Sequence, residues 1–436
     1  MIPLALDDVR ALALGKVDAE PGTERVTSVE IDSRRVKPGA LFVAVGRGVE
    51  YVDEAREQGA AATLVPDDAF AALAAIAKAV RAESDARVVA VTGSTAKTST
   101  KDILGALCAP HARTVVAEGS QNNEIGLPLT LCRLEENTEI AIVEMGMRGL
   151  GQIAELCEVA RPDIGIITRI GPVHLELLGA VERVAQAKAE LVESLPSGGT
   201  AIVPAGERYL EPYLGREDVS IVRFGPGGDV TLESFSPLGE RSLVAANVLG
   251  HVVTIEFAFT ARYNAVNALA ALAAYHALGL PLEAAQAGAG NIRLSRWRGE
   301  EVPLPGEGLL INDCYNANPL SMVAALEHLA ERAGDRRKVA VLGDMAELGP
   351  GAPAYHREVG GAASREGVEV LVAIGPLARG YLEGARGVRE THWAPTVEQG
   401  LAALRRLLRP GDCVLVKGSR AMGLEAVAEA LAVVPA

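Results

Sequence analysis

The sequence has few of the features that mark several large classes of protein. Its formal net charge is -14, whereas a nucleic-acid-binding protein normally presents an excess of basic side chains to the phosphates. Its five cysteines are scattered and never form a Cys-x-x-Cys pair, which argues against a disulfide framework or a zinc site. No apolar run reaches the roughly 20 residues that span a bilayer. We therefore expect a cytoplasmic protein without nucleic-acid or integral membrane contact.

Aliphatic side chains are abundant instead, and 436 residues are too many for one hydrophobic core. From residue 88, runs of β-branched character such as "RVVAVTG" and "EIAIVEMG" alternate with helical patterns, which is typical of buried parallel strands. The alternation resumes in "RKVAVLGDM" and "CVLVKGS". The sequence predicts an α/β protein of three domains: a small α/β N-terminal domain (1–83), a central P-loop-type doubly wound domain with a mostly parallel sheet (84–294), and a C-terminal Rossmann-like domain (295–436).

The stretch "VVAVTGSTAKTSTKDIL" at 88–104 has the character of a phosphate-binding loop between a strand and a helix. Gly93 would supply the turn, Lys97 a cation for the terminal phosphates, and Thr98 a hydroxyl for Mg²⁺. The spacing is more compact than GxxxxGK[ST], so an ordinary strand-to-helix turn is the competing interpretation.

Alanine stands at position 96, where such a loop is expected to have glycine. Glycine is required there only if φ is positive or if a methyl group would collide with phosphate; otherwise alanine is tolerated. A left-handed conformation would cost alanine about 1 kcal/mol, which weakens a site without abolishing it. The sequence alone leaves these cases open.

Three further side chains follow predicted strands or lie on a predicted helix. Glu144 ends a buried strand, where it is either a Mg²⁺ ligand or a salt-bridged terminus. His174 follows the strand "DIGIITRI" and is either a ligand or structural, and Lys188 in "AQAKAEL" is by default a solvated helix lysine. Taken singly, each has an ordinary structural explanation.

Taken together, these motifs resemble a known family. The segments "TGSTAKTSTKDIL", "GSQNNEIGLPLTL", "VEMGMRG", "GPVHLELLG", "AKAEL", "YNAVNALAA", "INDCYNANPLSM", "VLGDMAELG" and "VKGSR" occur in the order found in the Mur ligases. The segment "DSRRVKPGALFVAV" is similar to the uridine-binding segment of members that add the third and last residues. The resemblance covers about residues 31–423.

The resemblance implies an ATP-dependent amide ligase of peptidoglycan precursor synthesis, closest to the members that join D-alanyl-D-alanine to UDP-N-acetylmuramoyl-tripeptide. The carboxylate of the tripeptide would become an acyl phosphate, which the amine of the dipeptide then attacks. The implied cofactors are ATP and Mg²⁺, and a monomer is expected. Whether the third residue of the tripeptide is diaminopimelate, lysine or ornithine stays open.

The resemblance also implies roles for individual residues. Catalysis would fall to Lys97, Lys188 and His174, with Lys188 carbamylated so that it becomes an anion. The implied metal ligands are Thr98, Glu144, His174 and Lys188. The implied ATP-binding residues are Gly93, Ser94, Thr95, Ala96, Lys97, Thr98, Ser99, Asn264, Arg298 and Asp313. The implied substrate-binding residues are Ser33, Arg34, Asn122, Asn123, Asp344, Lys417, Ser419 and Arg420.

Three other hypotheses compete with an active ligase of this kind. Ala96 motivates a non-catalytic scaffold that keeps the fold but has lost ATP turnover. A P-loop nucleotide switch would leave Ser33, Arg34 and the C-terminal motifs unexplained, and a folylpolyglutamate synthase would not be expected to keep "DSRRVKPGALF". The sequence also departs from the family at Trp297, where glycine or methionine is common, and in "GRGVEYVDEA".

Overall fold

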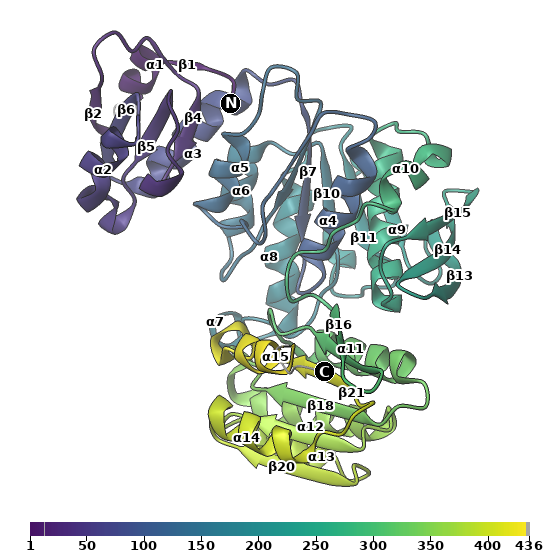
Figure 1. Ribbon diagram of the computed structural model, residues 1–436. Coiled ribbons are helices and arrows are strands. Elements are labelled where there is room, and N and C mark those ends of the chain that lie inside the picture. Colours follow the sequence, from purple (N-terminus) through teal and green to yellow (C-terminus); the bar gives the residue numbers. More distant parts are fainter. Residues whose placement is uncertain (13, 433–436) are drawn as a thin grey trace.

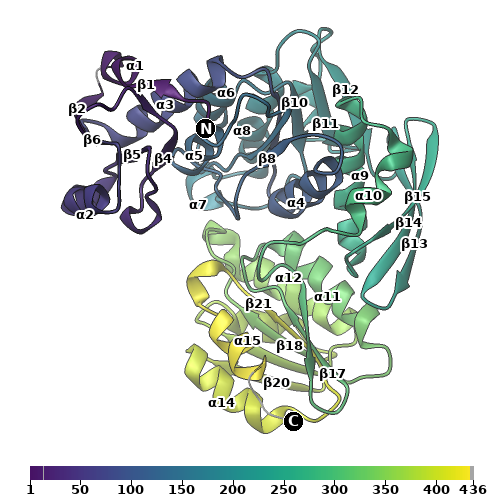
Figure 2. The same cartoon turned by 45° about the horizontal axis from the view of Figure 1, so that its top comes forward.

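The computed structural model describes residues 1–12 and 14–432. Three main sheets follow one another along the chain, and each is the centre of one lobe (Figure 1). The N-terminal lobe lies beside the central lobe, and the C-terminal lobe packs below the central one, which gives the molecule a bent outline in both views (Figures 1 and 2). In the described ranges, no helix is both long and apolar enough to cross a bilayer.

The N-terminal domain contains a four-stranded sheet in the order β2-β6-β5-β4, and a small β1-β3 ladder beside it. Its last helix, α3, begins where the Asp68 side chain accepts hydrogen bonds from the N–H groups of Phe70 and Ala71. The elements are β1 (Leu4–Ala5), α1 (Leu6–Ala11), β2 (Gly15–Ala19), β3 (Arg25–Val26), β4 (Ser28–Glu30), η1 (Ser33–Arg35), β5 (Ala40–Val43), η2 (Gly46–Tyr51), α2 (Val52–Glu57), β6 (Ala62–Pro66) and α3 (Ala69–Ala82).

The central domain contains a nine-stranded sheet in the order β15-β14-β13-β12-β11-β10-β7-β9-β8. The strands from β12 to β8 are parallel, and β13, β14 and β15 extend the sheet as antiparallel ribbons. The strands are β7 (Arg87–Thr92), β8 (Thr114–Val116), β9 (Ile140–Glu144), β10 (Ile164–Ile167), β11 (Thr200–Pro204), β12 (Ser220–Phe224), β13 (Val230–Leu238), β14 (Arg241–Val248) and β15 (His251–Phe257). The helices are α4 (Lys97–Cys108), α5 (Gly126–Leu131), α6 (Gln152–Ala160), α7 (Leu175–Leu178), α8 (Val181–Glu193), η3 (Glu211–Tyr213), α9 (Arg262–Ala277), η4 (Leu282–Ala284) and α10 (Gln286–Ala289).

Alternate residues of the central strands face two separate cores, as a strand period of two requires. Val88 and Ala90 pack with α5, α6 and α8, whereas Val89 and Val91 pack with α4 and α9. Because helices cover both faces, these strands are apolar throughout. Strand β7 lies between β9 and β10, so the loop that follows it opens at the point where the strand order reverses, the usual ligand position in such sheets.

The C-terminal domain contains a six-stranded sheet in the order β16-β17-β21-β18-β19-β20, which is parallel except at β16. Helices α11, α12 and α13 cover one face, and α14 and α15 the other. The elements are β16 (Glu300–Leu304), β17 (Gly308–Asn312), α11 (Pro319–Ala333), β18 (Lys338–Gly343), η5 (Gly349–Gly351), α12 (Ala352–Arg365), β19 (Val370–Ile374), α13 (Arg379–Gly384), β20 (Glu390–Ala394), α14 (Val397–Leu407), β21 (Cys413–Lys417), η6 (Arg420–Met422) and α15 (Glu425–Ala432).

The fold class predicted from the sequence is confirmed, with three α/β domains and mostly parallel sheets in the central and C-terminal domains. The apolar segments that we expected to be strands correspond to β7, β9, β10, β18 and β21. Strand β20 was not expected, because its sequence "ETHWA" is mostly polar. It is an edge strand with one neighbour, and edge strands tolerate polar side chains.

Candidate active site

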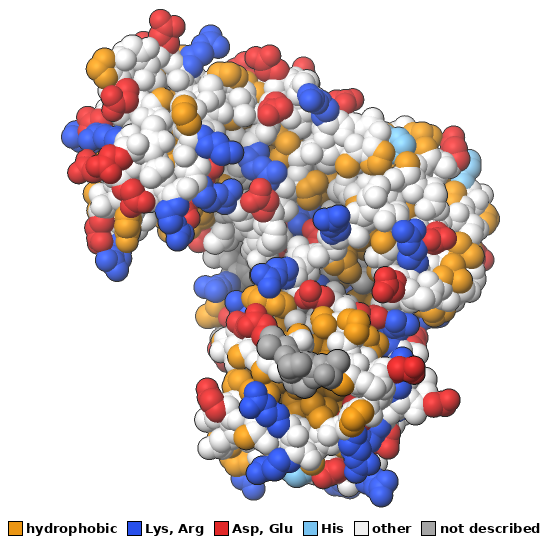
Figure 3. All heavy atoms as spheres, in the orientation of Figure 1, with side chains coloured by type: hydrophobic (Ala, Val, Ile, Leu, Met, Phe, Trp, Pro, Cys, Tyr) orange, Lys and Arg blue, Asp and Glu red, His pale blue; other side chains and the backbone are white. Residues whose placement is uncertain are grey.

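A cleft of about 1570 Å³ lies where the three domains meet. Its wall includes Phe70 from the N-terminal domain, the loop after β7, and side chains of the C-terminal domain. In the space-filling view the surface is hollowed beneath the N-terminal lobe, and several Lys and Arg side chains border the hollow (Figure 3). The lining carries nine Lys and Arg side chains and eight Asp and Glu side chains, so basic groups are enriched there relative to a chain of net charge -14 and are available to an anionic ligand.

The turn after β7 requires glycine at position 93. Gly93 has φ 149°, and a Cβ atom built there would lie 1.9 Å from the Thr168 hydroxyl oxygen. That hydroxyl lies 2.5 Å from the carbonyl oxygen of Thr95 and therefore supports the loop from β10. The positive φ and the close approach of Thr168 together explain the glycine.

Ala96 has φ 67° and ψ -3°, a left-handed conformation, and directly precedes α4. Of the two reasons for a glycine at this position, the structure therefore shows the first, a positive φ. An L-residue in this conformation costs about 1 kcal/mol, so Ala96 is strained. The loop nonetheless closes, and the Lys97 ammonium donates a 2.9 Å hydrogen bond across it to the Gly93 carbonyl oxygen.

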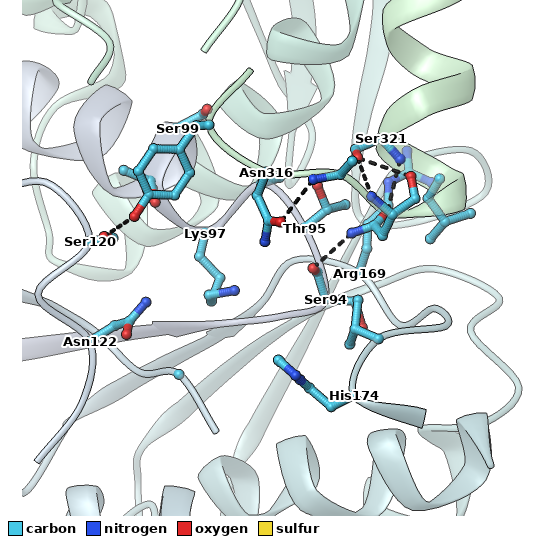
Figure 4. Close-up of a pocket in the computed structure, with 18 of the residues that line it drawn as sticks. Ser94, Thr95, Lys97, Ser99, Ser120, Asn122, Arg169, His174, Asn316 and Ser321 are labelled. Carbon is cyan, nitrogen blue, oxygen red and sulfur yellow. Dashed lines mark hydrogen bonds between the residues drawn. The ribbon is translucent and has the colours of Figure 1, made fainter. Parts of the chain in front are cut away.

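Lys97 extends into the cavity between Asn122 and His174 (Figure 4). Burial lowers the pKa of its ammonium, whereas the nearby Glu144 carboxylate acts in the opposite direction. Helix α4 also begins at Lys97, so unpaired backbone N–H groups and a side-chain cation face the same space. This combination suits a phosphate group.

Thr98 and Glu144 lie together, as the resemblance implied. Glu144 ends β9, is 1% exposed, and accepts a 2.8 Å hydrogen bond from the Thr98 hydroxyl. Its other oxygen accepts a 2.8 Å bond from the Asn122 amide. Arg298 of the C-terminal domain donates a 2.9 Å bond to the Thr98 hydroxyl oxygen. A hydroxyl and a carboxylate are hard oxygen donors, so this pair fits a Mg²⁺ ion.

His174 lies at the junction with the C-terminal domain, immediately before α7. Its Nδ1 atom contacts the carboxylate of Glu347, a residue that the sequence did not single out. Burial lowers the pKa of the His174 imidazole despite the opposing effect of Glu347. Glu347 follows β18 in the segment "GDMAELG", so the motif was recognised but the role of this side chain was not.

Lys188 lies on α8, lines the cleft and is 1% exposed. Burial, reinforced by the charge of Lys97, lowers its pKa well below the ordinary value. In the described residues no three His, Cys, Asp or Glu side chains form a metal-binding group. A protonated lysine adds no metal ligand to Glu144 and His174, since an ammonium has no acceptor.

The C-terminal domain provides the opposite wall. Arg298 stacks over the Tyr315 ring at 4.1 Å, and the Tyr315 hydroxyl contacts that of Ser120. The Asn318 amide donates a 3.2 Å bond to the Ser94 carbonyl oxygen of the phosphate loop. Sequence reasoning missed Tyr315 and Asn318, although both lie within the quoted segment "INDCYNANPLSM".

Most of the residues expected at the site do line the cleft: Ser94, Thr95, Ala96, Lys97, Thr98, Ser99, Asn122, Asn123, Glu144, His174, Lys188, Arg298, Asp313, Lys417, Ser419 and Arg420. Several of them have partners. Lys417 donates a 2.7 Å bond to the Asp313 carboxylate, and Ser419 accepts a 2.8 Å bond from the Ala346 N–H.

The remaining expected residues, Gly93 among them, lie outside the wall of the cleft. Asn264 is 1% exposed and accepts a 3.0 Å hydrogen bond from Asn267, which does line the cleft. Asp344 accepts a 2.6 Å bond from the Ala378 N–H, and burial raises its pKa. Ser33 and Arg34 lie in η1 of the N-terminal domain, where Arg34 is paired with Asp32 at 2.7 Å.

Comparison with protein families gives two matches that together span the central and C-terminal domains. The Mur ligase middle domain matches residues 91–275, and the Mur ligase, glutamate ligase domain matches residues 297–420.

The chain is also similar to named proteins over nearly its full length. It is 36% identical to the UDP-N-acetylmuramoyl-tripeptide--D-alanyl-D-alanine ligase of Mycobacterium tuberculosis, with 99% of this chain and 98% of that protein covered. It is 33% identical to the ligase of the same name from Escherichia coli, with 99% of each covered.

Solved structures agree with these relatives. A MurF structure from Acinetobacter baumannii superimposes with a TM-score of 0.86 at 27% identity and covers 99% of each chain. A MurF structure from Thermotoga maritima, in complex with ADP, gives a TM-score of 0.80 at 25% identity and covers 93% of this chain and 97% of that one. The chain belongs to the Mur ligase family.

Proposed function

We propose that this protein is an ATP-dependent amide ligase that joins D-alanyl-D-alanine to UDP-N-acetylmuramoyl-tripeptide in cytoplasmic peptidoglycan precursor synthesis, acting as a monomer. The relatives that carry the name of this activity align with 99% of this chain. The observation that carries the proposal is the cleft itself: the phosphate loop, the Thr98–Glu144 pair and the C-terminal wall face one cavity that all three domains border.

The chemistry requires two steps because a carboxylate is a poor electrophile. An oxygen of the tripeptide carboxylate attacks the γ-phosphorus of ATP, the bond to the ADP oxygen breaks, and an acyl phosphate forms. The neutral amine of the dipeptide then attacks the acyl carbon, inorganic phosphate leaves, and the nitrogen loses a proton. Lys97 and the N–H groups at the start of α4 would hold the phosphates, which makes catalysis mainly a matter of positioning and charge neutralisation.

Thr98 and Glu144 would hold one Mg²⁺, and His174 with Lys188 a second; bound Mg²⁺ would neutralise the crowded phosphate oxygens. Lys188 would act as a carbamate. Its lowered pKa favours the neutral amine, whose nitrogen attacks carbon dioxide to form a C–N bond and releases one proton. The product is an anion with two oxygens, and it would add a ligand that the His, Cys, Asp and Glu residues of the site do not supply.

The remaining residues are assigned to adenosine and to the two substrates. Adenosine would lie against Asn264, Arg298 and Asp313, where Asn267 is the member of the asparagine pair that lines the cleft. Ser33 and Arg34 would bind the uridine diphosphate, and Asn122 and Asn123 the sugar and peptide. The dipeptide would be bound by Lys417, Ser419 and Arg420, which line the cleft, and by Asp344, which lies outside its wall.

The test is phosphate release by the purified protein with ATP, Mg²⁺ and the UDP-linked tripeptide, with and without D-alanyl-D-alanine. We expect release that depends on the dipeptide and equals the pentapeptide formed. The strain at Ala96 favours a second candidate, a scaffold that binds nucleotide without turning it over. Bound ATP without phosphate release would support that candidate and refute the ligase.

A further inference from the structure

Two strained residues from different domains meet at the edge of the cleft. His174 of the central domain has φ 52°, and Glu347 of the C-terminal domain has φ 62°. Left-handed conformations are uncommon for residues other than glycine, and they persist only where the surroundings enforce them. In this case the two residues contact each other: the Nδ1 atom of His174 contacts the Glu347 carboxylate.

The backbone strengthens the same contact. The Glu347 carbonyl oxygen accepts a 2.8 Å hydrogen bond from the Leu175 N–H, one residue after His174. The Glu176 N–H also donates to this oxygen, at 3.4 Å, so two free N–H groups in the first turn of α7 are satisfied by the other domain. The side-chain and backbone contacts together fix Glu347 against α7.

The contact also decides which nitrogen of His174 carries the proton. An ionised carboxylate only accepts hydrogen bonds, so Nδ1 must be the donor. Nε2 of the neutral ring then keeps its lone pair and is the nitrogen free to bind a metal ion. Carboxylates commonly orient metal-binding imidazoles in this way.

We propose that Glu347 is a positioning residue, supplied by the C-terminal domain, which sets the tautomer and orientation of His174 and so makes metal binding at His174 depend on docking of that domain. The inference rests on the proposed metal role of His174. As a result, the proposed metal site at His174 would be complete only when the C-terminal domain, which would carry the dipeptide, is docked. Completion of the site at that moment would limit hydrolysis of the acyl phosphate by water.

The test measures metal binding without turnover. Free Mn²⁺ is followed by electron paramagnetic resonance in the presence of ADP, in the wild type, in Glu347→Gln and in His174→Ala. Gln keeps the size of Glu but is a weaker acceptor. We expect His174→Ala to abolish one class of bound Mn²⁺ and Glu347→Gln to weaken the same class about 10-fold. Glu176→Gln removes a neighbouring exposed carboxylate and should change nothing.

The double variant His174→Ala/Glu347→Gln separates positioning from general damage. If Glu347 acts through His174, the second substitution has no further effect on Mn²⁺ binding once His174 is gone. An equal loss in both backgrounds, or unchanged Mn²⁺ binding in Glu347→Gln, would overturn the proposal. A wild type without a His174-dependent class would overturn it as well.

Docking is measured separately, because coupling is reciprocal. Mn²⁺ with ADP should compact the wild type in small-angle scattering and compact Glu347→Gln less; equal compaction would refute the link to docking. These outcomes are distinct from a failure of the ligase proposal. A wild type that binds Mn²⁺ through His174 but forms no pentapeptide would refute the ligase and leave the coupling measurable.

Discussion

Lys97 and Lys101 lie one turn apart on α4, yet their surroundings are opposite. Lys101 is 1% exposed and its ammonium lies 2.6 Å from the Asp102 carboxylate and 2.7 Å from the Ala117 carbonyl oxygen. Lys97 faces the cleft and bonds a single carbonyl oxygen of its own loop. A buried cation with a full set of partners stabilises the fold, whereas a cation that faces a cavity without a carboxylate partner is available to a ligand.

The same contrast recurs between the other two buried lysines. Lys417 is bound to the Asp313 carboxylate and, at 3.0 Å, to the Asn316 carbonyl oxygen. Lys188 is as deeply buried, and burial itself lowers its pKa, reinforced by the charge of Lys97. Lys101 thus belongs to the architecture and Lys97 and Lys188 to the chemistry, whereas Lys417 is held by its partners at the wall of the cleft, and substitutions can test that division.

Replacing Lys97 should have the largest effect. Lys97→Met keeps the bulk of the side chain and removes the charge that would neutralise the phosphates, so kcat should fall about 10³-fold. The unfolding transition should hardly change, since no carboxylate partner is lost. Phosphate release and urea unfolding measure the two quantities. Lys78→Met, an exposed lysine on α3, is the control and should leave both unaltered.

Lys188→Ala should come next, with a loss of about 10²-fold in kcat, because the proposed carbamate ligand disappears. Short-chain carboxylic acids should restore part of the activity by placing a carboxylate in the vacated space. Titration of the variant with acetate and propionate measures the rescue. Activity equal to that of the wild type would remove Lys188 from the site.

Lys101→Met should produce the reverse pattern. Removing one partner of a buried ion pair leaves the Asp102 carboxylate without its cation, although Ser295 still donates hydrogen bonds to it, and costs about 3 kcal/mol of the free energy of unfolding. The loss should appear in urea unfolding, while kcat of the folded fraction stays within about three-fold, a factor worth less than 1 kcal/mol. A kcat loss as large as that of Lys97→Met would break the division between the two lysines.

The division could be predicted from the sequence only in part. The phosphate-loop motif identified Lys97, and the strand ending at Glu144 could be paired with Thr98 because parallel strands end at one edge. Lys101 could not be recognised as structural, because its partner Ala117 is known only once β8 is placed. The Glu347–His174 contact joins residues 173 positions apart in loops of two domains, which no local pattern encodes. The same limit applies to Asn267, which differs from Asn264 only in the direction it faces.

The smallest effect is expected at Ala96, and its sign is informative. Its left-handed φ costs about 1–2 kcal/mol, whereas glycine would cost about 0.5–1 kcal/mol in backbone entropy. Ala96→Gly should therefore stabilise the protein by about 0.5–1 kcal/mol, and kcat should change less than about three-fold if strain is the only cost.

The control is Ala106→Gly in the same helix, which should destabilise by about 1 kcal/mol because its φ is helical. A rise in kcat of ten-fold or more in Ala96→Gly would show that the methyl group also obstructs phosphate. Lys97 would then hold phosphate next to a loop that the Ala96 methyl group partly obstructs.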